Sequence, residues 1–326
     1  MSLNAAAYAL VRPFLDRPEL IGAASHRRGG AWILDCGVAE AGGVRAGLLM
    51  AEAALAGLGS VHVVPAAEAA AEFGGDWPAP PWPVVVVRTT APLAACLAAQ
   101  YAGWKVASGG YFAMASGPIR AAIGREPLYD RIGHRERPDV AVGVLESAHL
   151  PPEAVCLDLA ADAGVAPDRL VLLVARTASV AGGLQVVARS VETALHKLAD
   201  LGFDLSRIEA GVGAAPVPPV PDDDLEALGR TNDSVLYGAR VTLDVTGDDD
   251  SLAAIGPRCV SRSSASWGEP FRTIFDHAGR DFYAVDPAVF APAVVEFANR
   301  GTGRRQRFGE LAPAVLATSF ATGPVA

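Results

Sequence analysis

The sequence has 326 residues, 51% of them hydrophobic, and carries a formal net charge of −9. A chain of this length can bury a large core and can form two domains of about 150 residues each. The composition is typical of a globular protein and not of a disordered chain. The acidic balance argues against a nucleic-acid partner and against binding to anionic membranes.

Cysteines and histidines are scattered along the chain. The four cysteines include no C-x-x-C pair, and the six histidines form no H-E-x-x-H or H-x-H cluster. This spacing argues against a structural zinc site, and isolated thiols in apolar surroundings indicate a reducing compartment. No apolar run approaches the roughly 20 residues of a membrane helix, and the N-terminus shows no signal-peptide pattern. We therefore expect a cytoplasmic protein without a metal.

Helices and strands are mixed along the first half of the chain. Apolar spacing predicts helices over residues 4–22 (interrupted at Pro13), 44–58, 92–101 and 152–163. Short apolar runs predict strands at residues 31–36, 61–64, 84–87, 140–145 and 170–174. Prolines predict a connection over residues 74–83. Residues 103–118 read as mixed strand and turn, and residues 120–138 as a charged surface segment.

The second half of the chain contains fewer clear elements. Asp222, Asp223 and Asp224 are expected to cap a short helix that ends before Gly229. Alternation predicts a strand over residues 235–245, and an apolar run predicts another over residues 294–299. Arg304-Arg305-Gln306-Arg307 is basic but short and predicts an exposed turn.

This mixture lacks a strict βαβ rhythm, so we predict an α+β (mixed α/β) fold of two lobes. Lobe 1 spans approximately residues 1–150 and lobe 2 residues 151–326, with an exchange of segments allowed. Gly42-Gly43 and the following helix with Glu52 parallel Gly182-Gly183 and the helix with Glu192. An internal duplication and a chance resemblance of two glycine-bounded helices both explain this parallel.

The segment at residues 175–201 has the sharpest pattern. It follows a predicted strand, and its helix has two different faces. The apolar face carries Val187, Val191, Leu195 and Leu198, and the polar face carries Gln185, Arg189, Glu192, Thr193 and His196. An arginine, a carboxylate and an imidazole on one stripe suit a site. A solvated face with an ordinary i,i+3 ion pair explains them as well.

The common nucleotide and nucleophile motifs are missing. Gly211-x-Gly213 lacks a third glycine and follows a helix instead of a strand, which excludes a dinucleotide loop. The sequence has no G-x-x-x-x-G-K-[ST] phosphate loop and no G-x-S-x-G nucleophile elbow.

Four stretches place polar groups inside segments that otherwise read as buried, and they are read together with the polar helix described above. The four are Gln100-Tyr-Ala-Gly-Trp104 with Ser116-Gly117-Pro118, Gly229-Arg-Thr-Asn-Asp233 with Leu236-Tyr-Gly238, Trp267-Gly-Glu-Pro-Phe271, and Phe282-Tyr-x-x-Asp286; the R-x-x-E-x-x-x-H-K pattern of the helix, residues 189–197, comes after the first of them. In this order and spacing, from about residue 30 to about residue 319, the chain resembles the methenyltetrahydromethanopterin cyclohydrolase family. It departs from the family at Ser264-Ala-Ser-Trp267, where an Arg-Asp pair is expected, at Arg176, where proline is usual, and at Ala115, where glycine is expected.

The resemblance implies a reaction. The family hydrolyses the cationic methenyl bridge of N5,N10-methenyl-tetrahydromethanopterin to the N5-formyl derivative, reversibly and without metal or redox cofactor, as homotrimers with the substrate cleft between two lobes. Water must attack the amidinium carbon, so a carboxylate that accepts its proton is required. We expect Glu192 to position and deprotonate this water, and Arg189 to orient Glu192 and to hydrogen-bond the developing oxygen. Pairing with Arg189 lowers the pKa of Glu192, whereas burial raises it.

The resemblance also implies residues that bind the pterin substrate. Asn232 and Asp233 offer an amide and a carboxylate to the amino-pyrimidinone edge, and an Asx turn at the start of a strand is their structural alternative. Tyr111 and Phe112 can stack on the ring or lie in the core. At Ser116 and Gly117 the backbone can approach the ligand closely, or these residues can form a purely structural turn. His196 is read as a neighbour of Glu192 and not as the base. The departures leave a second function open, a paralogue that binds a reduced pterin without efficient catalysis.

Overall fold

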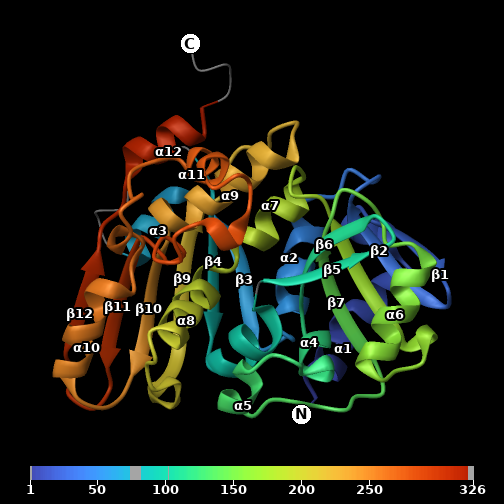
Figure 1. The fold of residues 1–326 in the computed structure, drawn as a ribbon, viewed down its shortest axis with the longest axis horizontal. Coiled ribbons are helices and arrows are strands. Elements are labelled where there is room, and N and C mark those ends of the chain that lie inside the picture. The colour runs from blue at the N-terminus through green and yellow to red at the C-terminus, as the bar shows by residue number, and fades with distance from the viewer. Residues whose placement is uncertain (1, 74–81, 102, 322–326) are drawn as a thin grey trace. The chain divides into compact units, whose positions relative to one another are not determined.

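The computed structural model describes residues 2–73, 82–101 and 103–321 (Figure 1). Most of the predicted connection at residues 74–83 lies outside these residues. Contacts divide the chain into two units: unit 1 comprises Met1–Ser60 and Leu93–Gln185, and unit 2 comprises Val61–Pro92 and Val186–Ala326. Each unit thus combines two separate stretches of the chain. The predicted division near residue 150, with an exchange of segments allowed, stays a prediction.

Unit 1 contains a six-stranded sheet in the order β1-β2-β8-β7-β6-β5. The central strands β2, β8 and β7 are parallel, and the outer pairs β1–β2, β7–β6 and β6–β5 are antiparallel. The strands are β1 (Ala24–Arg28), β2 (Ala31–Gly37), β5 (Trp104–Ser108), β6 (Tyr111–Ser116), β7 (Ala141–Glu146) and β8 (Leu170–Ala175).

Helices cover both faces of the centre of this sheet. On one face, the apolar side of α1 (Leu3–Leu15) and of α2 (Val44–Ala54) packs with Val144, Val171 and Leu173. On the other, α6 (Glu153–Ala163) and α4 (Ile119–Ile123) pack with Leu170 and Leu172. Every residue of β8 is therefore buried, which explains its uninterrupted apolar sequence. The remaining helical segments are η1 (Pro18–Ile21), the π-helix η2 (Leu93–Gln100), α5 (Leu128–Ile132), η3 (Pro167–Arg169) and α7 (Val180–Val187).

Unit 2 is built on a second six-stranded sheet, in the order β12-β11-β10-β9-β4-β3. Its pairs β12–β11, β10–β9 and β9–β4 are antiparallel, and β11–β10 is parallel. Two mixed sheets with helices confirm the predicted α+β fold. The strands are β3 (Gly59–Val64), β4 (Val84–Thr89), β9 (Ile208–Pro216), β10 (Arg240–Val245), β11 (Val294–Asn299) and β12 (Arg305–Gly309).

The helices of unit 2 form two groups. α8 (Ser190–Asp200) contacts β9 and β10, and α3 (Ala66–Phe73) contacts β4. A second group surrounds an aromatic cluster that includes Tyr237, Phe271, Phe275 and Phe320. Its helices are α9 (Asp224–Gly238), α11 (Phe271–His277) and α12 (Pro313–Ser319). The shorter segments are η4 (Leu205–Arg207), α10 (Asp249–Ile255), η5 (Gly256–Arg258), η6 (Ser261–Ser263) and η7 (Phe282–Ala284).

Several predicted boundaries were wrong. Pro13 lies in the last turn of α1 and does not interrupt it, although its ring nitrogen has no N–H to donate to the helix. α2 ends at Ala54, before a turn in which Ala56 and Gly57 have positive φ. In the segment at residues 175–201, a turn at Gly182-Gly183 followed by one helix was predicted; the structure has two helices, α7, which includes both glycines, and α8, separated at Ala188 and Arg189.

The largest error concerns α9. This helix does not end before Gly229 but continues to Gly238, so the strand predicted over residues 235–245 begins only at Arg240. Gly229 lies where α11 comes close: an added Cβ would be 3.0 Å from the Cβ of Arg272. A glycine that looks like a helix stop is therefore a point of close packing.

Candidate active site

The predicted catalytic residues lie at the start of α8. Arg189 is the N-cap residue, with φ −92° and ψ 10°, and Glu192 lies in the first turn. The carbonyl of Arg189 accepts hydrogen bonds from the N–H of Thr193 at 2.8 Å and from its hydroxyl at 2.9 Å. The positive end of the helix dipole stabilises a carboxylate in this position.

The polar stripe that carries Glu192 is not a solvated surface. Glu192 is only 2% exposed and Gln185 only 1%. One turn after Glu192, the His196 side chain is one-third exposed, with Nδ1 3.8 Å from Oε1 of Glu192 and Nε2 3.5 Å from Oδ2 of Asp200. The structure therefore places a buried carboxylate beside a partly exposed imidazole, on one face of one helix.

Two glycines of β9 set how closely α8 approaches the sheet. A Cβ at Gly211 would be 2.7 Å from Cγ1 of Val191, and a Cβ at Gly213 would be 2.4 Å from Oγ of Ser190. Larger residues in this Gly-x-Gly pair would push the start of α8 off the sheet. Gly211 and Gly213, which do not form a dinucleotide-binding loop, thus allow the start of α8, with Arg189 and Glu192, to pack closely on β9.

The last turns of α8 are fixed to the segment that follows η7. Nζ of Lys197 donates a hydrogen bond to the carbonyl of Pro287 at 2.8 Å, and burial lowers the pKa of this amine. Next to it, Oδ2 of Asp286 accepts from the hydroxyl of Ser264 at 2.7 Å, which holds the pKa of Asp286 below its usual value. Lys197 was named only as part of a motif, and its anchoring contact could not be foreseen.

Asn232 and Asp233 lie inside α9, not in an Asx turn. Nδ2 of Asn232 donates to the carbonyl of Leu228 at 2.9 Å, one turn back along the helix. Oδ1 of Asp233 accepts from the N–H of Phe271, the first residue of α11, at 2.7 Å. Burial raises the pKa of Asp233 to about 7, although hydrogen bonds from Ser319 and Phe271 oppose this shift. Their predicted contact with a pterin stays a prediction.

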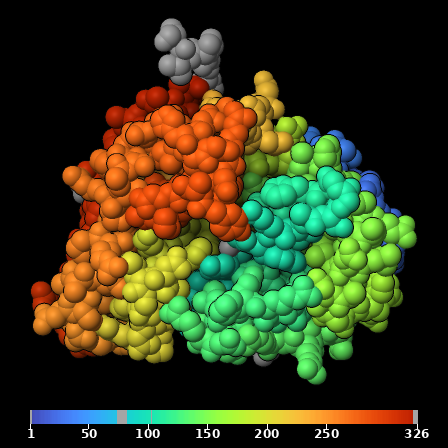
Figure 2. Space-filling model, in the orientation of Figure 1, coloured from blue at the N-terminus to red at the C-terminus, as the bar shows by residue number. Residues whose placement is uncertain are grey.

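The four candidate residues of unit 1 lie on β6 and in the turn after it. Tyr111 is buried in the core, and burial raises its pKa to about 12. Phe112 points to the other face and is 55% exposed, on a hairpin that lies at the surface in Figure 2. Ser116 is fully buried, and Gly117 has φ 96°. Only Phe112 among them presents a large exposed apolar surface.

Gly117 also fixes the end of the π-helix η2. Its N–H donates to the carbonyl of Ala99 at 2.9 Å, the hydroxyl of Tyr129 donates to Ala98 at 2.6 Å, and Nη1 of Arg120 donates to Leu97 at 3.3 Å. Three successive carbonyls that the helix leaves unpaired thus obtain partners. The segment at residues 120–138 was predicted as surface, but Arg120 is buried, because it holds this helix end and pairs with Glu126.

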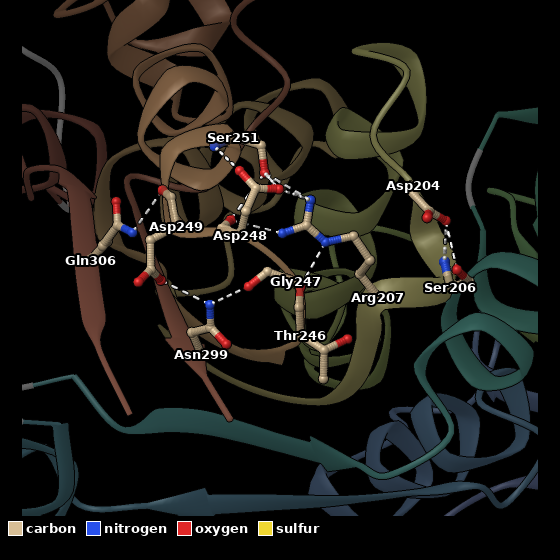
Figure 3. A network of polar contacts seen from close by, with 10 residues as sticks. All are labelled: Asp204, Ser206, Arg207, Thr246, Gly247, Asp248, Asp249, Ser251, Asn299 and Gln306. Atoms are coloured by element: carbon tan, nitrogen blue, oxygen red, sulfur yellow. Dashed lines mark hydrogen bonds and ion pairs between the residues drawn. The ribbon is translucent and has the colours of Figure 1, made fainter. Parts of the chain in front are cut away.

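Unit 2 also contains a polar network without any predicted site residue (Figure 3). Arg207 donates to the carbonyl of Thr246 at 2.6 Å and to the hydroxyl of Ser251 at 2.8 Å. Asn299 donates to the carbonyl of Gly247 and to the carboxylate of Asp249, both at 2.8 Å. These hydrogen bonds pair polar groups of the turn between β10 and α10, so the network stabilises the fold.

The described residues contain no group of three or more His, Cys, Asp or Glu side chains that could hold a metal ion. Among the helices of the same residues, none is long and apolar enough to cross a membrane.

Comparison with known proteins agrees with the motifs. The model of a family described as "Cyclohydrolase (MCH)" matches residues 2–320. The chain belongs to this family. Three similar proteins are named methenyltetrahydromethanopterin cyclohydrolase. The one from Methylobacterium sp. (strain 4-46) is 41% identical, with 98% of each chain covered. The one from Rhodopirellula baltica is 44% identical over 89% of this chain and 86% of its own. The one from Methanospirillum hungatei is 40% identical over 89% of each.

Hydrogen bonds connect the motifs of unit 2 that carry the family resemblance. The hydroxyl of Tyr237, in the Leu-Tyr-Gly motif, donates to the carbonyl of Glu269, and Asp233 accepts from Phe271. Both partners belong to the Trp267–Phe271 motif. In this family member the position with an expected Arg-Asp pair holds Ser264, which bonds Asp286 of the Phe-Tyr-x-x-Asp motif.

Proposed function

We propose that the chain hydrolyses the cationic methenyl bridge of N5,N10-methenyl-tetrahydromethanopterin to N5-formyl-tetrahydromethanopterin, reversibly. The observation that carries this proposal is the match of the family over residues 2–320, together with the buried carboxylate of Glu192 in the first turn of α8. A buried carboxylate both attracts the cationic substrate and accepts a proton from water.

The proposed chemistry uses Glu192 as the base and Arg189 as its partner. Glu192 takes a proton from water while the water oxygen bonds to the bridge carbon. This addition gives a neutral carbinolamine. The bond between its carbon and N10 then breaks as N10 takes up the proton that Glu192 holds, and the carbinolamine hydroxyl releases its proton to solvent as the carbonyl of the N5-formyl group forms. The Arg189 guanidinium orients Glu192 and hydrogen-bonds the oxygen as negative charge develops on it. No step of the proposed reaction requires a metal or a redox cofactor.

Substrate binding and assembly complete the proposal. Phe112 offers an exposed aromatic face to the pterin ring, and Tyr111, Ser116 and Gly117 shape the strand and turn beside it. The proposal includes a homotrimer, as the resemblance implies, and a location in the cytoplasm, as expected from the sequence. Sedimentation of the purified protein measures its oligomeric state.

Turnover tests the reaction. Purified protein is mixed with methenyl-tetrahydromethanopterin, and loss of the methenyl absorbance is followed, with methenyl-tetrahydrofolate in parallel. We expect rapid loss with the methanopterin derivative. Glu192→Gln should lower kcat by about 10²–10⁴-fold at unchanged folding, since this is what a positioned base contributes. Glu209→Gln, an exposed glutamate on β9, is the matched control in unit 2 and should keep full turnover.

The outcomes separate the two functions left open by the sequence. Unchanged turnover in Glu192→Gln would remove Glu192 from the mechanism. Absence of turnover in the wild type, with tight binding by calorimetry, would instead favour a pterin-binding protein without efficient catalysis.

A further inference from the structure

An open corner of the unit 1 sheet carries a carboxylate beside an exposed aromatic ring. Glu146, the last residue of β7, stands directly opposite Met114 of β6 in the antiparallel register. Side chains directly opposite each other share a face of the sheet, and so do residues two apart on one strand. Phe112, Met114 and Glu146 therefore lie on one face.

The helices that cover this face do not extend to Glu146. Val142 and Val144, the preceding residues of β7 on the same face, are buried in the core formed with α1 and α2. Met114 and Glu146 are half-buried, and Phe112 is exposed. In Figure 2 the β5–β6 hairpin, drawn in turquoise, forms part of the molecular surface. This corner therefore presents an aromatic ring and a carboxylate side by side to a ligand.

Hydrogen bonds hold this corner in place. The buried hydroxyl of Thr177 donates to Oε1 of Glu146. The next residue, Ser147, donates through its hydroxyl to the carbonyl of Phe112 at 2.8 Å and through its N–H to the carbonyl of Ala175 at 3.0 Å. The carboxylate is thus oriented at the carboxyl end of a parallel strand, the edge at which open sheets bind ligands.

We propose that Glu146 accepts the amino-pyrimidinone edge of the pterin, with Phe112 and Met114 as the apolar surface beneath the ring; the inference rests on the proposed function. This edge presents two neighbouring N–H donors, at N3 and at the 2-amino group, which match the two oxygens of a carboxylate. The planar ring stacks on Phe112. The Asp233 carboxylate, which sequence reasoning assigned to this edge, is buried and accepts from the backbone of Phe271.

A pair of ligands that differ only in the recognised group tests this inference. Tetrahydropterin carries the 2-amino group, and tetrahydrolumazine carries an oxygen in its place. Both are measured as competitive inhibitors of the wild type and of Glu146→Gln. The variant should bind tetrahydropterin about 10–100-fold more weakly, as expected for loss of a hydrogen-bonded charge, and tetrahydrolumazine equally well or better. KM for the substrate should rise similarly, and kcat at saturation should stay within about threefold.

Controls distinguish recognition from a structural effect. Glu153→Gln, an exposed glutamate of α6 in the same unit, should leave both inhibition constants unchanged. Phe112→Ala should weaken both ligands alike, since stacking does not depend on the 2-substituent. Equal weakening of both ligands by Glu146→Gln, or no weakening of either, would overturn the assignment of Glu146 while wild-type turnover remained. A wild type that neither binds nor converts the substrate would overturn the proposed function itself.

Discussion

The two sheets differ in how their faces are covered. In unit 1 the central strand β8 is buried at every position, because helices lie on both faces. In unit 2 the strand β10 alternates: Val241, Leu243 and Val245 are buried, and Thr242 and Asp244 are only half-buried. The face that carries Thr242 continues on β11 and β12 with the ion pair of Glu296 and Arg305.

This difference indicates different functions for the sheets. A parallel centre covered on both sides leaves its strand ends for ligand contact, and Glu146 and Thr177 lie at these ends. In unit 2 the face that carries Thr242 is covered by α3 over β4 and β9 but is only half-buried at β10, and the opposite face supports a helix. In unit 2 that helix is α8, which carries Arg189 and Glu192 over two glycines of β9. Substitutions at the Glu146 corner should therefore change KM, and substitutions on α8 should change kcat.

The covering of the strands can be tested by truncating adjacent side chains. On β8, Leu172 and Leu173 lie in cores on opposite faces, so each substitution to alanine should cost about 2–5 kcal/mol of unfolding free energy. On β10, Leu243→Ala should cost as much, but Thr242→Ala, on the half-buried face, should cost within about 0.5 kcal/mol. Urea unfolding of the four variants measures these differences.

Equal costs for Thr242 and Leu243 would contradict the one-sided packing of β10. A small cost for either leucine of β8 would show that one face of the unit 1 sheet is less well covered than the structure indicates. The m-values of the variants must agree with that of the wild type, since a changed m-value would indicate a change in the exposed surface and not only in stability.

Substitutions in the network of Figure 3 should lower the stability of the protein without lowering its activity. Arg207→Met removes the donors to Thr246 and Ser251 but keeps much of the apolar chain over Phe203. We expect a cost of about 1–3 kcal/mol, with kcat and KM unchanged. Gly247→Ala should have a similar effect, because the new Cβ would lie 2.5 Å from Nε of Arg207 and because Gly247 has φ 96°. A lower kcat under conditions in which the variant is fully folded would show that this network also affects the active site.

Much of the fold could be predicted where burial is continuous. The apolar runs of β4, β7, β8 and β11 predicted strands, since apolar runs of this length are typical of buried strands. The edge strand β12 was missed, because Arg305, Gln306 and Arg307 read as an exposed turn. Its pairing with β11 is a tertiary effect that charged residues on an edge do not reveal.

The site could be predicted only in part. The spacing of Arg189 and Glu192 placed them on one helix face, but the apolar period continues unbroken across the end of α7, so the break at Arg189 left no signal. The helix propensity of Gly229 predicted an end that close packing against Arg272 overrides. Asp233 was correctly seen as polar among buried residues, but its partner, the N–H of Phe271, is 38 residues away in the chain.

A last expected effect is a change in stability with pH at Asp233. Burial raises its pKa to about 7 in the folded protein, whereas an unfolded aspartate titrates near 3.9. Between these values the folded state binds the additional proton. The stability that neutral Asp233 contributes is therefore complete below about pH 4 and is lost as the pH rises through 7.

Asp233→Asn removes this titration and keeps an oxygen for the N–H of Phe271. Relative to the wild type, the variant should gain stability as the pH rises from 5 to 8, by about 2–3 kcal/mol, because the folded wild type binds about one additional proton up to pH 7 and this is worth about 1.4 kcal/mol per pH unit. Urea unfolding at both pH values measures the change, and Asp222→Asn, at an exposed position before the same helix, corrects for the loss of one formal charge. If the difference in unfolding free energy between the variant and the wild type does not vary between pH 5 and 8, Asp233 stays ionised when buried. A buried charged carboxylate would need a neighbouring cation, and the contacts of Asp233 with Phe271 and Ser319 do not supply one.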